Sequence, residues 1–234
     1  MNERDLLKCE KDVFGFYLTG DPFKEVAPLG RAFATASLTE VPKTGDGKLL
    51  RVAGLVTWFK KHSTKKGDTM AFLTIEADGV SIDITLFPKI YRESSHMLIV
   101  DEPLFLVIRT QDVNGVIKVN AEKLLTIDDL NSDGFASGNL NIPMNLCRKD
   151  TYEKLMNVFR QFPGTVPFVL QVTTPESEVV TITPPSNLKI SLSPGLLNKI
   201  EQICGKGTFS LAFPELDALR ERNVRGYSKN FANG

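Results

Sequence analysis

The sequence is poor in the residues that build metal centres and disulfide frameworks. Its 234 residues include three cysteines, Cys9, Cys147 and Cys204, and two histidines, His62 and His96. An odd, widely spaced set of cysteines predicts no disulfide framework, and a zinc site needs three or four closely grouped ligands. We therefore expect no metal, no cofactor, and reduced thiols typical of a cytoplasmic protein.

Long apolar runs are absent as well. The longest, such as Met97–Val100 and Leu104–Ile108, are far too short to span a bilayer. The charged start, Met1–Asp5, leads into no apolar stretch, so we expect no signal peptide and no membrane partner. Apolar residues still make up 42% of the chain, which is enough for a packed core in one large or two small domains.

The chain also has no excess of either charge, because 28 basic residues balance 28 acidic ones. A neutral total argues against a nucleic-acid-binding protein, but the charges are unevenly distributed. Residues 48–66 contain six basic and no acidic residues, whereas residues 67–134 contain twelve acidic and five basic residues. The net charge of zero is therefore a cancellation between a basic segment and an acidic one.

Signatures of common enzyme classes fail residue by residue. The sequence has no G-x-S-x-G nucleophile elbow. The glycine-rich stretch 204–208 would need Gly at position 200 and Ser or Thr at 207 to match a phosphate-binding loop, but Ile200 and Gly207 stand there. A nuclease or polymerase needs carboxylates clustered for two metal ions. Asp128 and Asp129 are not grouped with further carboxylates in this way. We therefore predict no enzyme activity for this chain.

Residues 129–134 match the first half of a calcium-binding loop. Asp129, Asn131 and Asp133 place oxygen atoms at alternate positions, and a glycine follows for the sharp turn. The twelfth position should carry a bidentate glutamate and instead holds Leu140. We favour a solvated linker between domains for this stretch, with calcium binding as the alternative.

From Leu50 onward the pattern changes to short β-rich runs separated by turns. Gly54 indicates a bend or bulge inside the first run, and Asn114-Gly115 is a strong hairpin signal. Strands are expected over 50–59, 70–76, 80–87, 104–110 and 116–124, with a helix over 89–97. Five strands with a helix between the third and fourth is the order of the OB-fold, a small, partly open barrel. We assign this domain to residues 47–127.

Less regular segments flank the expected barrel. Residues 1–46 are expected to be a helical and extended lead-in, 128–139 a polar linker, and 214–234 a tail that is helical up to Asn223. Residues 140–213 are expected to form a small α+β domain. Its strands would cover 140–146, 166–172, 179–182, 189–192 and 208–213, and its helices 149–162 and 194–204. The predicted fold class is β-rich α+β, with a five-stranded OB-fold barrel followed by this small domain.

The basic segment lies where OB-folds bind their ligands. The loop between the first two strands borders the ligand groove, together with the face of the second and third strands. We expect Lys60, Lys61, Lys65 and Lys66, in a basic turn over 60–68, to contact phosphates. Arg51 is a further basic candidate. A solvated hairpin tip is the alternative for the same charges.

Three aromatic residues could stack on bases beside this turn, namely Trp58, Phe59 and Phe72. Stacking of this kind contributes about 1–3 kcal/mol per base. Phe59 and Phe72 could instead belong to the barrel core. Trp58 and Phe59 point to opposite faces of a regular strand, so we expect at most one of the two to line the groove.

Three groups of motifs occur in order along the chain. Residues 10–22 read E-K-D-V-F-G-F-Y-L-T-G-D-P. Residues 51–56 read R-V-A-G-L-V, 64–72 read T-K-K-G-D-T-M-A-F and 83–88 read D-I-T-L-F-P. Residues 163–167 read P-G-T-V-P, followed by L-S-P at 192–194. This order resembles the C-terminal region of the alpha subunit of bacterial DNA polymerase III, a C-family replicative polymerase. Asp21 departs from the family, which has histidine there, and the turn 77–79 is shorter than the family's.

The resemblance covers roughly residues 8–213, and it implies functions for both domains. The OB-fold domain would contact the single-stranded DNA template through Lys60, Lys61, Lys65 and Lys66. The following domain would help to dock the polymerase catalytic subunit or domain to the clamp-loader tau subunit. The family's palm, catalytic aspartates and phosphoesterase domain have no counterpart in this sequence, so the resemblance implies a non-catalytic part.

We therefore interpret the chain as a non-catalytic, single-stranded-DNA-binding and assembly module of a polymerase III alpha-like protein from a bacterium or phage. It would be separately encoded or part of a longer polymerase. Its affinity should fall with salt and depend little on sequence. The alternative is a protein-interaction module that docks polymerase or clamp-loader subunits without binding DNA. An RNA-binding OB-fold fits the expected fold but not the flanking motifs.

Overall fold

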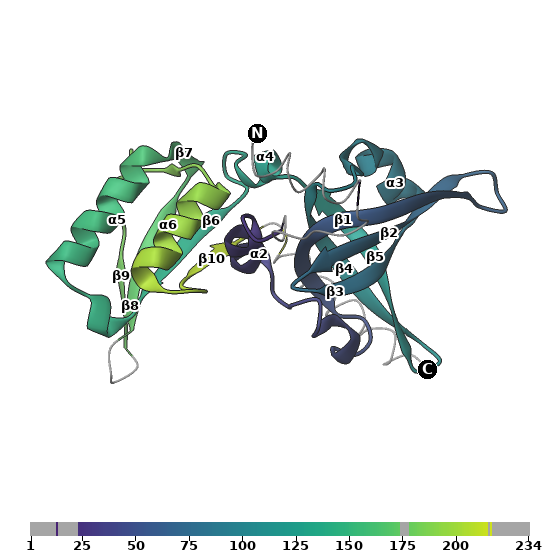
Figure 1. The fold of residues 1–234 in the computed structure, drawn as a ribbon, viewed down its shortest axis with the longest axis horizontal. Helices are drawn as coiled ribbons and strands as arrows, with labels where there is room; N and C mark the ends of the chain where they lie inside the picture. The colour runs from purple at the N-terminus through teal and green to yellow at the C-terminus, as the bar shows by residue number, and fades with distance from the viewer. Residues whose placement is uncertain (1–12, 14–22, 174–177, 215, 217–234) are drawn as a thin grey trace, which may run out of the picture. The chain divides into compact units, whose positions relative to one another are not determined.

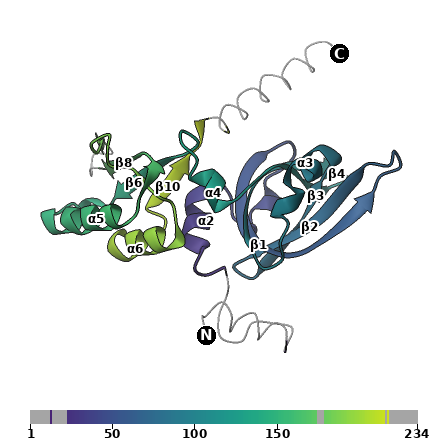
Figure 2. The same ribbon diagram turned by 90° about the horizontal axis from the view of Figure 1, so that it is seen from above.

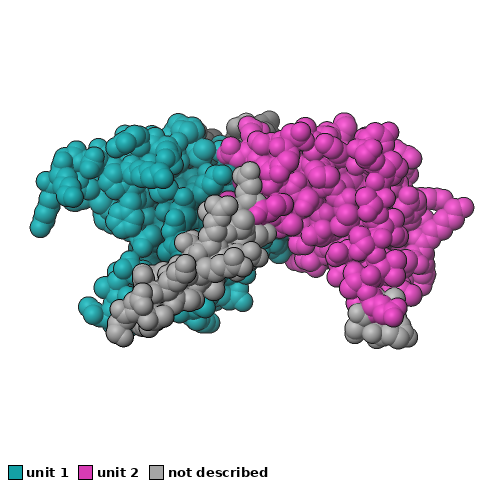
Figure 3. All heavy atoms as spheres, turned by 180° about the vertical axis from the view of Figure 1, so that it is seen from behind, with its two compact units in different colours: residues 1–126 teal, residues 127–234 magenta. Residues whose placement is uncertain are grey.

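The computed structural model describes residues 13, 23–173, 178–214 and 216 of the chain. These residues divide into two compact units, 1–126 and 127–234, which Figure 3 shows in different colours. The expected helix near the N-terminus, most of the 10–22 motif and nearly all of the expected tail lie outside the described residues.

The first unit contains a closed barrel of five strands (Figure 1). The strands are β1 (Leu49–Ser63), β2 (Thr69–Ala77), β3 (Val80–Leu86), β4 (Pro103–Val113) and β5 (Val116–Leu125). They close in the order β1-β2-β3-β5-β4, with α3 (Pro88–Ser94) and a 3-10 turn (Ser95–Met97) between β3 and β4. Neighbouring strands are antiparallel except β3 and β5. This arrangement confirms the predicted OB-fold barrel.

Every second side chain along β2 and β3 points into the barrel and fills its core. In β2, Ala71, Leu73 and Ile75 are fully buried, whereas the residues between them point outward and are exposed or half-buried. In β3, Ile82, Ile84 and Leu86 are buried in the same way. A period of two is expected for strands with one face on a core, so the outward residues of β2 and β3 form a separate outer face.

Strand β1 pairs with two neighbouring strands. Its first half pairs with β4 from Leu49 to Leu55, and its second half pairs with β2 from Leu55 to Ser63. Gly54 lies where the strand changes partner, and a Cβ atom there would be 2.9 Å from the carbonyl oxygen of Glu76. Glycine therefore permits the close approach of two strands at this bend, as the sequence suggested.

The predicted basic turn over 60–68 is wrong in its first part, because β1 continues to Ser63. Lys60 and Lys61 are paired with Phe72 and Ala71 of β2. The turn itself is limited to Thr64–Asp68. The physical reason is that β2 begins at Thr69, and its first residues complete their ladder only if β1 extends beside them.

The lead-in segment contributes to the core of the first unit. Helix α2 (Ala27–Phe33) begins with Pro28 in its first turn and buries Leu29 and Phe33 completely. The Phe33 ring packs edge-on against Phe105 of β4 at a centroid distance of 5.3 Å. A 3-10 turn (Val41–Lys43) follows, with Val41 fully buried.

Before that turn, Glu40 accepts hydrogen bonds from the backbone N–H and the hydroxyl of Ser37, both at 2.8 Å. These hydrogen bonds lower the pKa of the Glu40 carboxyl group.

The second unit is a sheet with two helices on one face (Figure 2). The sheet order is β10-β6-β8-β9, formed by β6 (Ser137–Ile142), β8 (Phe168–Thr173), β9 (Val179–Ile182) and β10 (Phe209–Ala212). The helices are α5 (Lys149–Gln161) and α6 (Pro194–Cys204). Phe159 of α5 contacts Phe168 of β8 with ring centroids 4.4 Å apart. The hydroxyl of Ser193 accepts a hydrogen bond from the Leu196 N–H and caps α6.

The smaller elements of this unit differ from the sequence-based expectations. The expected linker 128–139 contains most of α4 (Ile127–Leu130) and the start of β6, with Leu130 and Ala136 buried. The expected strand 140–146 ends at Ile142 and is followed by a 3-10 turn (Met144–Leu146).

The expected strand 189–192 is reduced to isolated bridges from Ile190 to residues 163 and 166. A short strand, β7 (Pro163–Val166), precedes β8. Local composition does not reveal these partners, because they are distant in sequence.

Candidate nucleic-acid interface

The second half of β1 and the first half of β2 form a two-stranded hairpin, here called the basic arm (residues 58–72), which extends from the barrel (Figure 1). A tight turn closes it. The Thr64 N–H donates to the Asp68 carbonyl at 2.8 Å, and the Thr64 hydroxyl oxygen accepts from the Asp68 N–H at 3.1 Å. Gly67 has a φ of +86°, which favours glycine. Lys65 and Lys66 lie exposed at the tip of this turn.

A β-bulge decides which side chains of the arm face outward. Val56 pairs with Ile75 and is buried in the barrel, but the next paired residues are Trp58 and Thr74. The extra residue is Thr57, whose hydroxyl lies 3.3 Å from the Thr74 carbonyl oxygen. In a regular strand, Trp58 would face the same side as Val56. The bulge therefore turns Trp58 to the outer face.

Three predicted site residues meet on this outer face. Trp58 is 49% exposed and Phe72 is 40% exposed. Lys60 is the cross-strand partner of Phe72, and Trp58 is the partner of Thr74, the next outward residue of β2. The rings of Trp58 and Phe72 are therefore diagonal neighbours. Two exposed aromatic faces beside a lysine are the elements of a platform for unpaired bases.

The other face of the arm carries Phe59 and Lys61. Phe59 pairs with Leu73 and Lys61 with Ala71, both of which are buried in the barrel. Phe59 is half-buried and Lys61 is exposed. Trp58 and Phe59 thus lie on opposite faces as expected, with Trp58 on the outer one. Phe59 packs on the core side, whereas Phe72 faces outward rather than into the core.

Arg51 lies apart from the arm. It pairs with Val107 of β4, and its Nε donates to the Phe33 carbonyl oxygen at 2.9 Å. Its backbone N–H donates to the Thr35 hydroxyl oxygen at 2.9 Å, and its guanidinium group lies 5.9 Å from the centre of the Phe33 ring. These contacts hold the lead-in segment against β1, and the DNA-binding role of Arg51 stays a prediction.

The charges of the arm are not neutralised locally. Within the described part of the chain, Lys60, Lys61, Lys65 and Lys66 form no ion pair. The acidic residue of the turn, Asp68, instead lies 3.9 Å from Arg92 of α3. These four solvated ammonium groups give the arm a positive potential.

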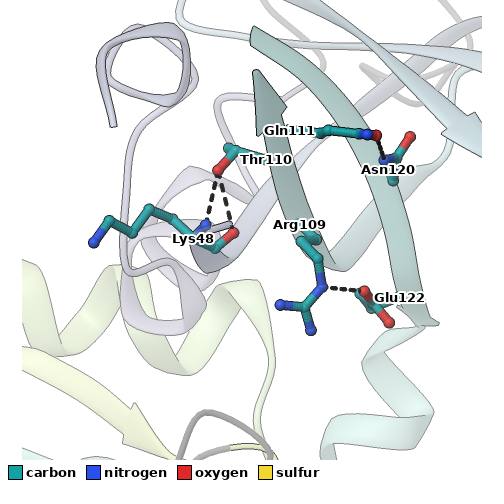
Figure 4. Close-up of polar contacts among 6 residues, drawn as sticks. All are labelled: Lys48, Arg109, Thr110, Gln111, Asn120 and Glu122. Carbon is teal, nitrogen blue, oxygen red and sulfur yellow. Dashed lines mark hydrogen bonds and ion pairs between the residues drawn. The ribbon is translucent and has the colours of Figure 1, made fainter. Parts of the chain in front are cut away.

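A row of cross-strand neighbours, polar beyond Phe72, continues the outer face toward the hairpin formed by β4 and β5. Phe72 pairs with Thr85 of β3, Thr85 with Asn120 of β5, and Asn120 with Arg109 of β4. Figure 4 shows the far end of this row. Asn120 donates from Nδ2 to the Gln111 Oε1 at 3.2 Å.

Further contacts hold this end of the row in place. Arg109 pairs with Glu122 through its Nε. The next residue of β4 is the buried Thr110, whose hydroxyl oxygen accepts a hydrogen bond from the Lys48 N–H and so joins β4 to the start of β1.

Sequence reasoning missed His62 and two carboxylates of this face. The His62 ring lies 6.1 Å from the Phe72 ring. The spacing of two from Trp58 through Lys60 could have identified it. Glu76 and Asp83 also point outward, because they alternate with buried residues of β2 and β3. Their alternation was readable from the sequence, but their place beside Trp58 depends on strand register.

The segment that half matches a calcium-binding loop is hydrogen-bonded to a part of the chain that is distant in sequence. The Asn131 Nδ2 donates to the Leu192 carbonyl at 2.9 Å, and its Oδ1 accepts from the Leu192 N–H at 2.6 Å. Asp133 lies 3.4 Å from the Lys189 ammonium group. The described residues contain no group of three or more histidine, cysteine, aspartate or glutamate side chains that could hold a metal ion.

Burial raises the pKa of the Cys204 thiol, so this group favours its neutral form. Cys147 is exposed. No helix in the described ranges is long and apolar enough to cross a membrane.

Searches with family models gave no match to this sequence. Among solved structures, the chain has a weak likeness to a mitochondrial single-stranded DNA-binding protein from S. cerevisiae. The TM-score is 0.30 and the identity 9%, over 35% of this chain and 94% of the other. A RecG structure bound to a three-way DNA junction gives a TM-score of 0.29 at 14% identity, over 48% of this chain and 15% of the other.

Sequence comparison gives a more extensive match. The chain is 25% identical over 179 residues to DNA polymerase III subunit alpha of Pseudomonas aeruginosa, which covers 76% of this chain and 15% of that protein. It is 24% identical over 219 residues to the same subunit of Escherichia coli O157:H7, over 90% and 18% of the two chains. The subunit of Vibrio cholerae is 23% identical, also over 90% and 18%.

The chain therefore spans less than a fifth of the length of these relatives. The comparisons and the closed barrel confirm that this chain resembles the OB-fold region of the DNA polymerase III alpha subunit.

Proposed function

We propose that this chain is a non-catalytic module that binds single-stranded DNA in a replicative polymerase of the polymerase III alpha type. One observation carries the proposal. The bulge at Thr57 places Trp58 on the same outer face as Lys60 and Phe72, beside a turn with two unpaired lysines. Similarity to polymerase alpha subunits supports a role in DNA replication.

The mechanism combines charge and stacking. The ammonium groups of Lys60, Lys65 and Lys66 would follow the phosphates of one strand, and its bases would stack on Trp58 and Phe72. Each stacked base contributes about 1–3 kcal/mol, and phosphate contacts make the affinity depend steeply on salt. Neither interaction distinguishes strongly between bases, so the module would accept a template of any sequence.

The polymerase context is part of the proposal. The matched relatives are polymerase subunits, but this chain spans less than a fifth of their length. We propose that it acts with a polymerase catalytic subunit or domain, which supplies the chemistry and holds the template near the arm. Docking to a clamp-loader tau subunit is the finer proposal for the second unit.

Fluorescence anisotropy with labelled oligo-dT of about 12 nucleotides tests the binding directly. We expect binding in the micromolar range at low salt. Lys65→Glu with Lys66→Glu should weaken it at least tenfold, because each change replaces a phosphate attraction with a repulsion. Lys149→Glu with Lys154→Glu, on α5 of the second unit, is the control with the same change of net charge. Equal affinities for both double variants would refute the role of the arm.

A protein-interaction module remains the second candidate, and one observation favours it. Strand β9 lies at the edge of the second sheet, and Val179, Val180 and Ile182 on it are 57%, 50% and 44% exposed. Exposed β-branched residues on an edge strand can pair with another chain. Co-purification with a polymerase or clamp-loader subunit, together with no binding of oligo-dT, would favour this candidate over the first.

A further inference from the structure

The outer face that carries the aromatic platform also carries two unneutralised carboxylates. Asp83 of β3 is the cross-strand partner of Thr74, which in turn is the partner of Trp58. Glu76 is the next outward residue of β2. Both side chains are exposed, and neither forms an ion pair with any described residue.

Local hydrogen bonds hold both carboxylates on the surface. The Thr74 hydroxyl donates to Asp83 Oδ1 at 2.7 Å, and the Ser81 hydroxyl donates to Glu76 Oε2 at 3.4 Å. These contacts hold the carboxylates on the outer face, with Glu76 at the end away from the lysines and Asp83 beside Trp58. The face is therefore positive at the arm and negative toward the β2–β3 turn.

The distance from the lysines to Glu76 along the outer face is close to the separation of the two backbones of a DNA duplex. Along β2, Glu76 lies four residues from Phe72, which corresponds to about 13 Å at the rise of a strand. The major groove of B-form DNA is about 12 Å wide. A duplex with one backbone on Lys60 and the arm would therefore bring its second backbone over Glu76, and Asp83, the partner of Thr74 on β3, would lie between the two backbones.

We infer that Glu76 and Asp83 are specificity-determining residues that make this face select single-stranded over double-stranded DNA. The inference rests on the proposed function. A single strand places its phosphates on the lysines and its uncharged bases over Trp58 and Phe72, so no row of phosphates lies over Glu76 and the repulsion is weaker than for a duplex. A duplex places a second row of phosphates against Glu76, and like charges at such distances repel.

The test compares affinities for a labelled oligo-dT and for a blunt duplex of the same length, at about 50 mM salt. The variant Glu76→Gln with Asp83→Asn keeps the hydrogen-bonding shape and removes both charges. We expect its affinity for the duplex to rise about fivefold and its affinity for oligo-dT to rise about twofold or less. The preference for single strands should therefore fall. A gain in affinity cannot come from unfolding.

The matched control is Asp150→Asn with Glu153→Gln on α5, which changes the net charge equally and should leave the preference unchanged. An unchanged preference in the Glu76 and Asp83 variant, or the same shift in the control, would overturn the inference while leaving DNA binding by the arm intact. If the wild-type chain binds neither DNA, both the proposed function and the inference fail.

Discussion

At the scale of single residues, the proposed DNA binding depends on which of two adjacent aromatic side chains faces outward. Trp58 is exposed on the outer face, whereas Phe59 is half-buried and pairs with the fully buried Leu73. Neighbours in sequence therefore have separable roles. One should contribute to binding and the other to folding.

Trp58→Ala should weaken binding of oligo-dT by roughly tenfold, since it removes a stacking surface of about 1–3 kcal/mol. It should change the thermal midpoint little, because the ring is largely outside the core. Phe59→Ala is the paired variant, and it should lower the midpoint while affecting affinity less. Anisotropy and thermal unfolding of both variants measure the two effects. The reverse pattern would mean that the bulge does not set the outer face.

The residue scale also marks a limit of sequence reasoning. The alternation in β2 was sufficient to group Phe72 with Glu76, but not to place Asp83 beside Trp58. The position of Asp83 beside Trp58 depends on the bulge at Thr57 and on the register of β1, β2 and β3. Arg51 was grouped with the lysines by charge alone. Its hydrogen bond to the Phe33 carbonyl oxygen, eighteen residues earlier, could not be read from local sequence.

At the scale of elements, β1 is the part on which the barrel and the site both depend. It pairs with β4 in its first half and with β2 in its second, and it bends at Gly54 and bulges at Thr57. The first half closes the barrel and the second half forms the basic arm. A change at the bend should therefore affect stability first and binding only as a consequence.

Gly54→Ala should destabilise the protein by about 1–3 kcal/mol, a typical cost of overpacking. The added methyl group would lie 2.9 Å from the Glu76 carbonyl oxygen and 3.2 Å from the Ile75 Cβ, so the two strands must separate. Gly195→Ala is the control, because its Cβ would only reach an ordinary contact of 3.4 Å with Phe162. Urea unfolding measures both. Equal stability of the two variants would contradict this explanation of the bend.

Most elements of the barrel could be predicted from sequence, because their signals are local. Alternation, the Asn114-Gly115 turn and Pro88 at the start of α3 each act within a few residues. The second unit was harder to predict. The expected linker contains Leu130 and Asn131, whose burial and hydrogen bonds depend on partners such as Leu192, 61 residues later. Composition near residue 131 is polar and gives no indication of those partners.

At the scale of the whole molecule, the net charge of zero conceals an ordered separation of charge. The barrel has a basic arm at one end of its outer face and carboxylates at the other, and both are formed by β1–β3. A neutral chain of this kind has no general attraction for DNA. Its binding should be local to the arm, modest in strength and sensitive to salt.

The salt dependence of oligo-dT binding tests this account most directly. With Lys60, Lys65 and Lys66 on the phosphates, a plot of log affinity against log salt should have a slope of about −2 for the wild-type chain. Lys65→Glu with Lys66→Glu should make the slope shallower by at least about 1.4, while the α5 control keeps the wild-type slope. Binding whose slope is the same in all three proteins would contradict the central claim that the basic arm holds the DNA.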